Sequence, residues 1–369
     1  MTCATALVFQ DIYRGRGFSP LTTSWTRYGL AYDLIESLGL FQGGLRLLTP
    51  VEASEDELRL VHTPDYIARV WEADARGEGA LDGRDTPAWR GMYRRAALAV
   101  GGTLLGARAI MHGEVSHAFN PAGGLHHARA DRASGFCIFN DIVIATRLLQ
   151  REFGLERIAI IDVDGHHGDG TQALLYNEAI LKVSLHQYDG RFYPGTGSTV
   201  ERGAGGGYLY NINLPLTRRV GDAFYQNSFD LFVPPLLHQY RPQFIIVQFG
   251  ADAHVSDPLV GLRLTTDTYV HLIQRLHQMA HLLCDGRLLF LGGGGYNPRT
   301  VARVWAILTA TLSGALPAWA RTDYQALFDT ERPPVDVEAE VATTGPLSNL
   351  YEGVRDYWRL WDVPPDWLD

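Results

Sequence analysis

The segment from Ile158 to Gly170 constrains the fold and the chemistry of this chain more than any other. It reads IAIIDVDGHHGDG, so an apolar, strand-like run passes directly into three carboxylates, two histidines and three glycines. Asp162, Asp164 and Asp169 cannot all be buried without partners, because an isolated carboxylate in an apolar interior costs many kcal/mol. Metal coordination, pairing with histidine or exposure must relieve them. Solvated loop charges are the less favoured interpretation, because α/β enzymes place ligands where a hydrophobic strand enters a glycine-rich turn.

A metal site is the first hypothesis for this segment. In extended backbone Asp164 and His166 project to the same side, because they are two residues apart, and zinc accepts carboxylate and imidazole ligands. Asp252 follows another apolar run and can complete an Asp–His–Asp set, which leaves one coordination position open, as a catalytic zinc requires. Such a metal would lower the pKa of a bound water and polarise a carbonyl. Other roles stay open for two residues. Asp252 could instead be a helix cap or a turn residue. His254 could be an extra ligand, a residue that contacts the ligands without binding the metal, or an exposed side chain.

Composition restricts the class of protein. The chain has 369 residues, of which 46% are hydrophobic and 20% charged, enough for one large domain or two modest ones. A net charge of -9 argues against a nucleic-acid partner. Cys3, Cys137 and Cys284 are widely spaced, which suits a reducing compartment. Without a signal-peptide pattern or ~18 uninterrupted apolar residues, we predict a cytoplasmic protein with no membrane partner and leave its oligomeric state open.

Strand-like runs alternate with helical patterns, which is typical of a parallel sheet covered on both faces. We predict strands at Ala4–Phe9, Ser116–Asn120, Arg157–Asp162, Leu181–His186, Phe244–Gly250 and Arg287–Leu291. We predict helices at Asp65–Ala75, Trp89–His112, Asp141–Phe153, Asp222–Tyr240, Thr266–Cys284 and Pro298–Leu312. The expectation is a single α/β domain with a central parallel sheet flanked by helices. Its main part is residues 1–315, and residues 316–369, with an amphipathic piece near 349–360, form a C-terminal extension packed on the same domain.

The predicted strand ends bring further reactive residues to one rim. His126 and His127 are adjacent, and Asp162 and Asp169 could each accept a ring N–H from one histidine and fix its tautomer. A base for water and an acid for the leaving amine are what amide hydrolysis needs. Tyr296 follows four glycines, where the backbone can approach closely and a phenol could stabilise an oxyanion. The alternatives are an ordinary surface loop for the histidines and a phosphate cradle for the glycines, although no Lys-Ser/Thr follows them.

Five motifs together resemble the zinc-dependent histone deacetylase superfamily, which has the arginase/deacetylase fold. They are NPAGGLHHA (120–128), ASGFCIFND (133–141), DVDGHHGDG (162–170), YPGTG (193–197) and LGGGGY (291–296). The resemblance covers roughly residues 20–315, which would make residues 1–315 the deacetylase catalytic domain. Among subfamilies the chain is most similar to bacterial acetoin-utilisation deacetylases, on the segments HAFNPAGG (117–124), DRASG (131–135) and DAH (252–254).

This resemblance implies a metal-dependent amidohydrolase that deacetylates lysine in proteins or peptides, with acetyl-CoA synthetase as the implied substrate. The implied zinc ligands are Asp164, His166 and Asp252. The implied catalytic residues are His126, His127, Asp162, Asp169 and Tyr296, with the second histidine as base and the first as an electrostatic or proton-relay partner. The implied substrate-binding residues are Asp85, Gly135, Phe136, Tyr193 and Leu259, where the two aromatic residues form the walls of an acyl-lysine tunnel. A structural potassium ion is implied at Asp162, Asp164, His166, Ser184 and Leu185, partly through backbone carbonyls.

The chain departs from the family pattern at two places. Gly165 stands where the family usually has alanine or an aliphatic residue, which predicts a looser metal loop. The segment 18–27 keeps Arg27 but lacks the usual His-Pro…Pro pattern, which leaves substrate preference open. An acetylpolyamine substrate is disfavoured, because Leu259 takes the place of an acidic gatekeeper. A binuclear manganese ureohydrolase would need more metal carboxylates, and a non-enzymatic binding module would be expected to lack Tyr296 or a histidine.

Overall fold

Parallel β-structure forms the centre of the molecule, as the alternating pattern predicts. The structure is a computed structural model, and it describes residues 3–15, 26–82, 85–314 and 325–362. Eight strands form one sheet in the order β2-β1-β5-β10-β9-β6-β7-β8, and every neighbouring pair is parallel. Their bounds are β1 (Thr5–Val8), β2 (Arg46–Leu48), β5 (His117–Asn120), β6 (Ile158–Asp162), β7 (Leu181–Gln187), β8 (Asn211–Leu216), β9 (Phe244–Gln248) and β10 (Leu288–Leu291). A separate antiparallel pair is β3 (Ala80–Asp82) with β4 (Thr86–Pro87).

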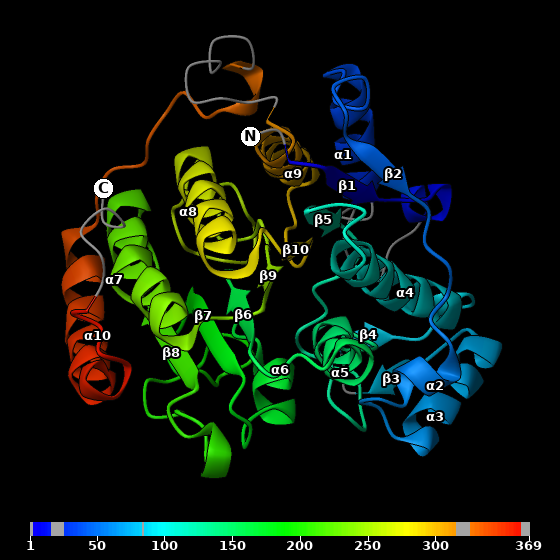
Figure 1. Cartoon of the computed structure of the whole chain (residues 1–369), viewed down its shortest axis with the longest axis horizontal. Helices are drawn as coiled ribbons and strands as arrows, with labels where there is room; N and C mark the ends of the chain where they lie inside the picture. Colours follow the sequence, from blue (N-terminus) through cyan, green and yellow to red (C-terminus); the bar gives the residue numbers. More distant parts are fainter. Residues whose placement is uncertain (1–2, 16–25, 83–84, 315–324, 363–369) are drawn as a thin grey trace.

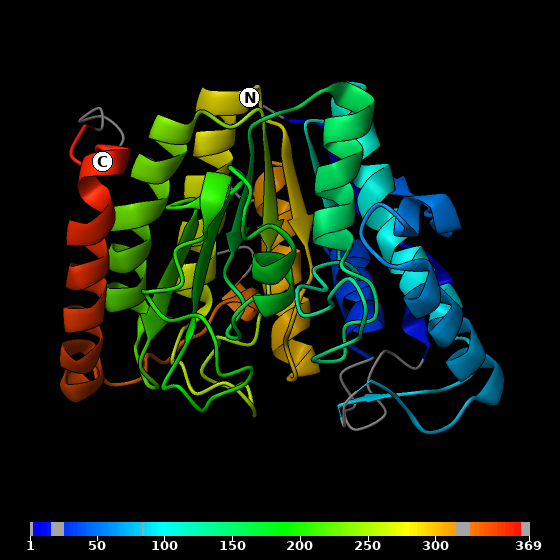
Figure 2. The same ribbon diagram turned by 90° about the horizontal axis from the view of Figure 1, so that it is seen from below.

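Helices cover both faces of the sheet (Figures 1 and 2). They are α1 (Thr26–Ser37), α2 (Glu55–Leu58), α3 (Pro64–Arg76), α4 (Met92–Met111), α5 (Asp141–Phe153), α6 (Asp169–Leu174), α7 (Asp222–Tyr240), α8 (Thr266–Cys284), α9 (Pro298–Leu312) and α10 (Val337–Trp358). Side chains alternate between the faces along each strand. In β10, Leu288 and Phe290 join the core under α1, α7, α8 and α9, whereas Leu289 and Leu291 join the core under α3, α4 and α5.

The predicted strands and long helices are confirmed, with ends that differ by a few residues. The sequence analysis missed β2, β8, the short β3–β4 pair, α1 and α6. The two missed strands of the main sheet are at its edges, and Arg46–Leu48 is short and largely exposed, so it carries little hydrophobic signal. Proline occupies position 215 in β8, and an edge strand tolerates proline because one side of it needs no ladder hydrogen bond. The predicted helix at 89–112 begins instead at Met92, after Gly91 in left-handed conformation.

The C-terminal segment packs on the same core. The amphipathic piece near 349–360 is the second half of α10, which lies beside α7 and β8 (Figure 1). The Trp358 indole donates to the Leu209 carbonyl at 2.8 Å, and the Thr217 amide donates to the Thr343 hydroxyl at 3.0 Å. The prolines at 364–365 lie outside the described residues, and a boundary at residue 315 stays a prediction. None of the helices in the described ranges has the length and apolar character needed to cross a membrane.

Parallel pairing fixes the position of the site. In the strand register, Asn120, Leu291, Gln248 and Asp162 stand side by side as the last residues of four adjacent strands, and Ser184 of β7 pairs with Asp162. The loops that carry the candidate residues leave the sheet at this edge, where open α/β sheets bind ligands. We refer to it as the carboxyl edge.

Candidate active site

Three donors of a candidate metal site meet at the carboxyl edge. The ligand atoms of Asp164, His166 and Asp252 all lie within 4.8 Å of one another, and all three residues are buried. The His166 Nδ1 atom lies 2.9 Å from Asp252 Oδ2 and 3.2 Å from Asp164 Oδ1. Asp164 and His166 come from the turn after β6, and Asp252 comes from the turn after β9. The structure therefore brings together the three residues for which the sequence predicts zinc binding.

Positive charge stabilises this buried set of donors. Burial alone would lower the pKa of His166, but hydrogen bonds and charge from Asp164 and Asp252 raise this pKa to about 10. Burial, reinforced by the Asp164 charge, raises the pKa of Asp252 to about 7. Two carboxylates and one imidazole nitrogen around one point also match the ligand chemistry of a catalytic zinc. The residues present therefore fit a divalent cation.

Backbone and amide groups hold the carboxylates in place. The Gln248 side-chain amide and the Gly294 amide donate to Asp164 Oδ2 at 2.6 and 2.7 Å. The Gly165 amide donates to Asp252 Oδ1 at 2.6 Å. A Cβ atom at position 294 would lie 2.3 Å from Asp252 Oδ2, so only glycine brings the backbone this close. Gln248 is a residue of this candidate site that the sequence analysis missed, although its place near the end of a predicted strand is a usable signal.

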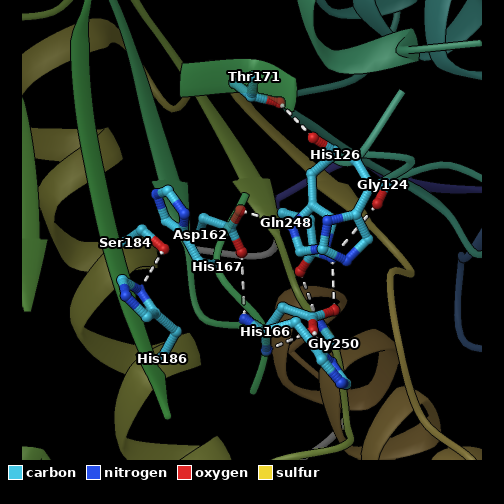
Figure 3. A network of polar contacts seen from close by, with 12 residues as sticks. Gly124, His126, Asp162, His166, His167, Thr171, Ser184, His186, Gln248 and Gly250 are labelled. Carbon is cyan, nitrogen blue, oxygen red and sulfur yellow. Dashed lines mark hydrogen bonds and ion pairs between the residues drawn. The ribbon is translucent and has the colours of Figure 1, made fainter. Parts of the chain in front are cut away.

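Two histidine–carboxylate pairs lie beside the metal donors, and Figure 3 labels the residues of one of them, His126 and Asp162, together with His166. His126 Nδ1 lies 2.7 Å from Asp162 Oδ2, His127 Nδ1 lies 2.7 Å from Asp169 Oδ1, and the two Nε2 atoms are 3.0 Å apart. Burial opposes charge on His126, but the carboxylates of Asp162 and Asp164 raise its pKa to about 9. Burial and the charge of His126 lower the pKa of His127 to about 4. The structure thus places both histidines and both carboxylates as the pattern predicts.

Asp141, at the start of α5, anchors the loop that carries the tandem histidines through hydrogen bonds. Its carboxylate accepts the amides of Gly124 and Leu125 at 3.0 and 2.8 Å and the Thr103 hydroxyl at 2.6 Å. A buried carboxylate with these donors satisfies its charge without a metal. The sequence analysis assigned no role to Asp141, and its place as the first residue of a predicted helix is the signal that could have found it.

His62 supports the same loop from the other side. The Asn140 amide donates to its Nε2 atom at 3.0 Å, and its Nδ1 atom lies 3.0 Å from the Arg129 carbonyl oxygen. These contacts fix a neutral ring that donates through Nδ1 and accepts through Nε2. Arg129 in turn donates to Asp169 Oδ2 at 2.6 Å. His62 was missed because nothing near it in the sequence indicates chemistry.

Tyr296 lies at the end of the glycine loop, beside the metal donors. Its ring centroid is 6.3 Å from that of His166 and 6.4 Å from that of Phe136. Burial, with the charges of Asp252 and Asp164, raises the pKa of the phenol, so it keeps its proton. Arg27 donates to the Gly295 carbonyl at 2.9 Å and therefore fixes the residue before Tyr296. Residues 18–25 of the atypical first segment lie outside the described residues.

Aromatic side chains border the approach to the metal donors. The Tyr193 ring lies 5.1 Å from the His127 ring, and its hydroxyl is 2.7 Å from the Ser134 hydroxyl oxygen. Phe136 is half-buried beside Tyr296. Phe192, for which the sequence analysis proposed no role, stacks on His166 with centroids 5.0 Å apart.

The remaining predicted substrate residues lie near this border. The Gly135 amide donates to Asp85 Oδ2 at 3.1 Å, so the aspartate is tied to the loop that carries Phe136. Leu259 is half-exposed, and its amide donates to Asp257 Oδ1 at 2.9 Å. The other oxygen of Asp257 accepts the Tyr296 amide at 2.8 Å, which joins the Leu259 loop to the glycine loop.

Gly165 has a packing explanation. A Cβ atom there would lie 2.6 Å from Val260 Cγ1 and 3.1 Å from Asp252 Oδ1. Val260 is buried and fills the space that a side chain at position 165 would take. The backbone of Gly165 is held at both ends, because its carbonyl also accepts the Gln187 amide at 3.0 Å. Close packing around Gly165 therefore argues against the looser metal loop that this glycine predicts.

The residues predicted to bind potassium lie between β6 and β7. Ser184 pairs with Asp162 in the strand register, and Leu185 follows it in β7. The Ser184 hydroxyl lies 2.9 Å from His186 Nδ1. These positions are compatible with a cation beside Asp162, and potassium binding stays a prediction.

His254 does not join the metal donors. Its Nε2 atom lies 2.8 Å from Asp329 Oδ2, and its Nδ1 atom lies 3.0 Å from the Ser256 hydroxyl oxygen. The ring is buried. The structure therefore excludes an exposed side chain, one of the alternatives that the sequence left open for His254. Both ring nitrogens of His254 contact Asp329 and Ser256 instead of the three metal donors.

Comparison with known proteins gives a consistent result. Residues 22–312 match the model of the histone deacetylase domain. The chain is 40% identical over 297 residues to the acetoin utilization protein AcuC of Bacillus subtilis, covering 78% of this chain and 76% of that protein. It is 37% identical over 334 residues to a probable deacetylase of Archaeoglobus fulgidus, covering 89% of each. It is 35% identical over 301 residues to AcuC of Staphylococcus xylosus, covering 79% and 77%.

Proposed function

The chain belongs to the histone deacetylase family and is a hydrolase of acetylated amides, and we propose that it removes the acetyl group from acetyl-lysine in proteins by zinc-dependent hydrolysis. One observation carries the proposal: two histidine–carboxylate pairs and a three-donor metal set share one buried cluster at the carboxyl edge. Asp164, His166 and Asp252 would hold the zinc ion. When bound, zinc would supply a Lewis acid that polarises the amide carbonyl and activates water.

The histidine pair supplies proton transfer. His126 and His127 hold one proton more than two neutral rings, because their pKa values of about 9 and about 4 lie on opposite sides of neutrality. We assign the base to His127, whose Nε2 atom takes a proton from the attacking water and returns it to the leaving amine nitrogen. Asp169 holds its Nδ1–H, and His126 with Asp162 keeps positive charge beside it. An acetyl-CoA synthetase as the natural substrate rests only on likeness to the family.

Tyr296 supplies the oxyanion donor in this proposal. Its phenol keeps its proton, and its ring centroid lies 6.3 Å from that of His166. An O–H donor aimed at the carbonyl oxygen stabilises the negative charge that develops as the tetrahedral intermediate forms. Arg27 and Asp257 both fix the peptide bond before Tyr296, because Arg27 donates to the Gly295 carbonyl and the Tyr296 amide donates to Asp257.

Substrate shape follows from the border of the site. Phe136 and Tyr193 would flank the aliphatic part of an acyl-lysine arm, and Asp85 beside Gly135 would accept a substrate backbone N–H. Leu259 offers an apolar side chain at the rim, which gives a second ammonium group no partner. We also propose a structural potassium ion at Asp162, Asp164, His166, Ser184 and Leu185, and a cytoplasmic location.

A substrate comparison tests this function. We expect the purified, zinc-loaded protein to show a higher kcat/KM for an acetyl-lysine peptide than for acetylspermidine. Leu259→Glu is the matched variant, because it adds one carboxylate at the rim and leaves the metal donors unchanged; it should improve the relative rate with acetylspermidine. A wild-type preference for acetylspermidine would favour the polyamine substrate, and no hydrolysis of either amide would contradict the proposal.

A further inference from the structure

A second group of metal-ligand side chains lies far from the active site. Cys3, His117, His277 and His281 place one donor atom each within 4.8 Å of one another. None of them belongs to the site described above, and the sequence analysis did not connect them. We call this group the Cys-His cluster. His117 is the first residue of β5, so the cluster lies at the end of the parallel sheet opposite the carboxyl edge.

The contacts within the cluster point to one centre. Cys3 Sγ lies 3.2 Å from His281 Nε2. His277 Nε2 lies 3.0 Å from His117 Nε2 and 3.0 Å from His281 Nε2. Ligands around a tetrahedral zinc ion would be about 3.3–3.6 Å apart, given Zn–N of ~2.0–2.1 Å and Zn–S of ~2.3 Å. These three distances therefore differ from those in a zinc site by a few tenths of an ångström.

Hydrogen bonds alone satisfy this arrangement poorly. An imidazole nitrogen carries either one hydrogen or one lone pair, so it makes one well-directed hydrogen bond. His277 Nε2 faces two other Nε2 atoms, and His281 Nε2 faces both a nitrogen and a sulfur. A cation at the centre would accept all four lone pairs at once.

Three separate elements build the cluster. His277 and His281 are four residues apart on the last turns of α8, so they share one face of the helix. His117 is the first residue of β5, and Cys3 stands just before β1, its neighbour in the sheet. The C-terminal end of a helix carries partial negative charge, which favours a cation there.

The turn after α8 leaves room for the rings. Gly286 has a φ of +78°, and a Cβ atom on it would lie 2.9 Å from His281 Cε1 and 3.4 Å from His117 Cε1. A side chain at this position would push apart two members of the cluster. The backbone here is therefore shaped around the imidazole rings.

We propose that Cys3, His117, His277 and His281 form a structural zinc site that ties the start of the chain to α8 and β5. One thiolate and three imidazoles are a borderline-soft donor set that suits zinc. Four protein ligands leave no open position, so the ion would take no part in hydrolysis. It would link residue 3 to residue 281 and stabilise the amino ends of β1 and β5.

Metal counting with ligand variants tests the site. We expect the full-length protein to bind about two zinc ions per chain, Cys3→Ser to bind about one, and Asp164→Ala to bind about one. Cys284→Ser is the matched control, because Cys284 is a second cysteine near the same end of α8 that is outside the cluster. It should keep both ions.

Cobalt substitution identifies the ligand independently of catalysis. Co²⁺ bound at the cluster should show a thiolate-to-cobalt charge-transfer band, which Asp164→Ala and Cys284→Ser should keep and Cys3→Ser should lose. Zinc should also raise the Tm of Asp164→Ala but not that of the Cys3→Ser/Asp164→Ala double variant. Should Cys3→Ser fail to fold, His281→Asn changes a more exposed ligand and serves the same purpose. Unchanged metal content and an unchanged charge-transfer band in the cluster variants would overturn the site, whatever the outcome at the active site.

Discussion

The Nε2 atoms of His126 and His127 lie 3.0 Å apart, while each Nδ1 atom lies 2.7 Å from a carboxylate of its own. The two rings therefore face each other across one shared proton, and each is oriented from behind by an aspartate. Protonation of one ring opposes protonation of the other, so the pair titrates in two separated macroscopic steps. Between these two steps, at neutral pH, the pair holds one proton more than two neutral rings.

Removal of the proposed base tests the proton-transfer role of this pair. His127→Ala should lower kcat by at least ~10²-fold, the usual scale for general acid–base catalysis. His167→Gln is the control, because the His167 ring contacts Thr196 and Gln172 instead of the metal donors, and it should stay close to the wild type. Wild-type kcat should fall at acidic pH as the pair gains a second proton and at alkaline pH as it loses its last one. A His127→Ala enzyme with near-normal turnover would exclude this residue as the base.

Tyr296→Phe tests the oxyanion donor, because it removes only the hydroxyl and keeps the ring beside His166. We expect kcat to fall by about 10²–10³-fold, the effect of losing one such donor. KM should change little, because the transition-state oxyanion gains more from the bond than the ground-state carbonyl does. Steady-state kinetics on an acetyl-lysine peptide give both values. Unchanged kcat would mean that the tyrosine only packs the loop.

Gly165→Ala tests the packing explanation for this departure from the family. The new methyl group would meet both Val260 methyls, at 2.6 and 2.7 Å, and overpacking of this kind costs roughly 1–3 kcal/mol. Val260→Ala removes those methyls, so the double variant should recover part of the loss in the free energy of unfolding. Urea unfolding of the two single variants and the double variant measures the coupling. Additive effects would show that the two positions do not interact.

His62 predicts an acid-sensitive contribution to stability. Burial lowers its pKa from 6.5 to about 4 in the folded chain. Between these values the unfolded chain binds a proton that the folded chain does not, so stability is lost as pH falls from about 6.5 to about 4. His62→Gln, which cannot titrate, should lose less stability between pH 7 and pH 4.5 than the wild type does, by about 2–3 kcal/mol. Equal losses in urea unfolding would mean that His62 is protonated in the folded state as well.

The sequence predicted the features that depend on the alternation of side chains along a strand and on where the parallel strands end. Asp164 and His166 could be placed on one side of a turn because strand geometry is regular, and Asp252 could join them because parallel strands end at one edge. The positions of Gln248 in a strand and of Asp141 at a helix start were visible in the sequence, but their partners were not, because the contacts join segments that are 84 and 16 residues apart in the chain. The link between Cys3 and His281 spans 278 residues and follows no motif spacing, so only the fold brings these residues together.

Metal content and deacetylation measured together on Asp164→Ala test the central claim most directly. We predict that this variant binds one zinc ion fewer per chain than the wild type, keeps its fold by circular dichroism, and releases no acetate from an acetyl-lysine peptide above background. The loss follows because Asp252 and His166 alone cannot complete the donor set. Wild-type zinc content together with wild-type acetate release in Asp164→Ala would contradict a catalytic zinc at Asp164, His166 and Asp252.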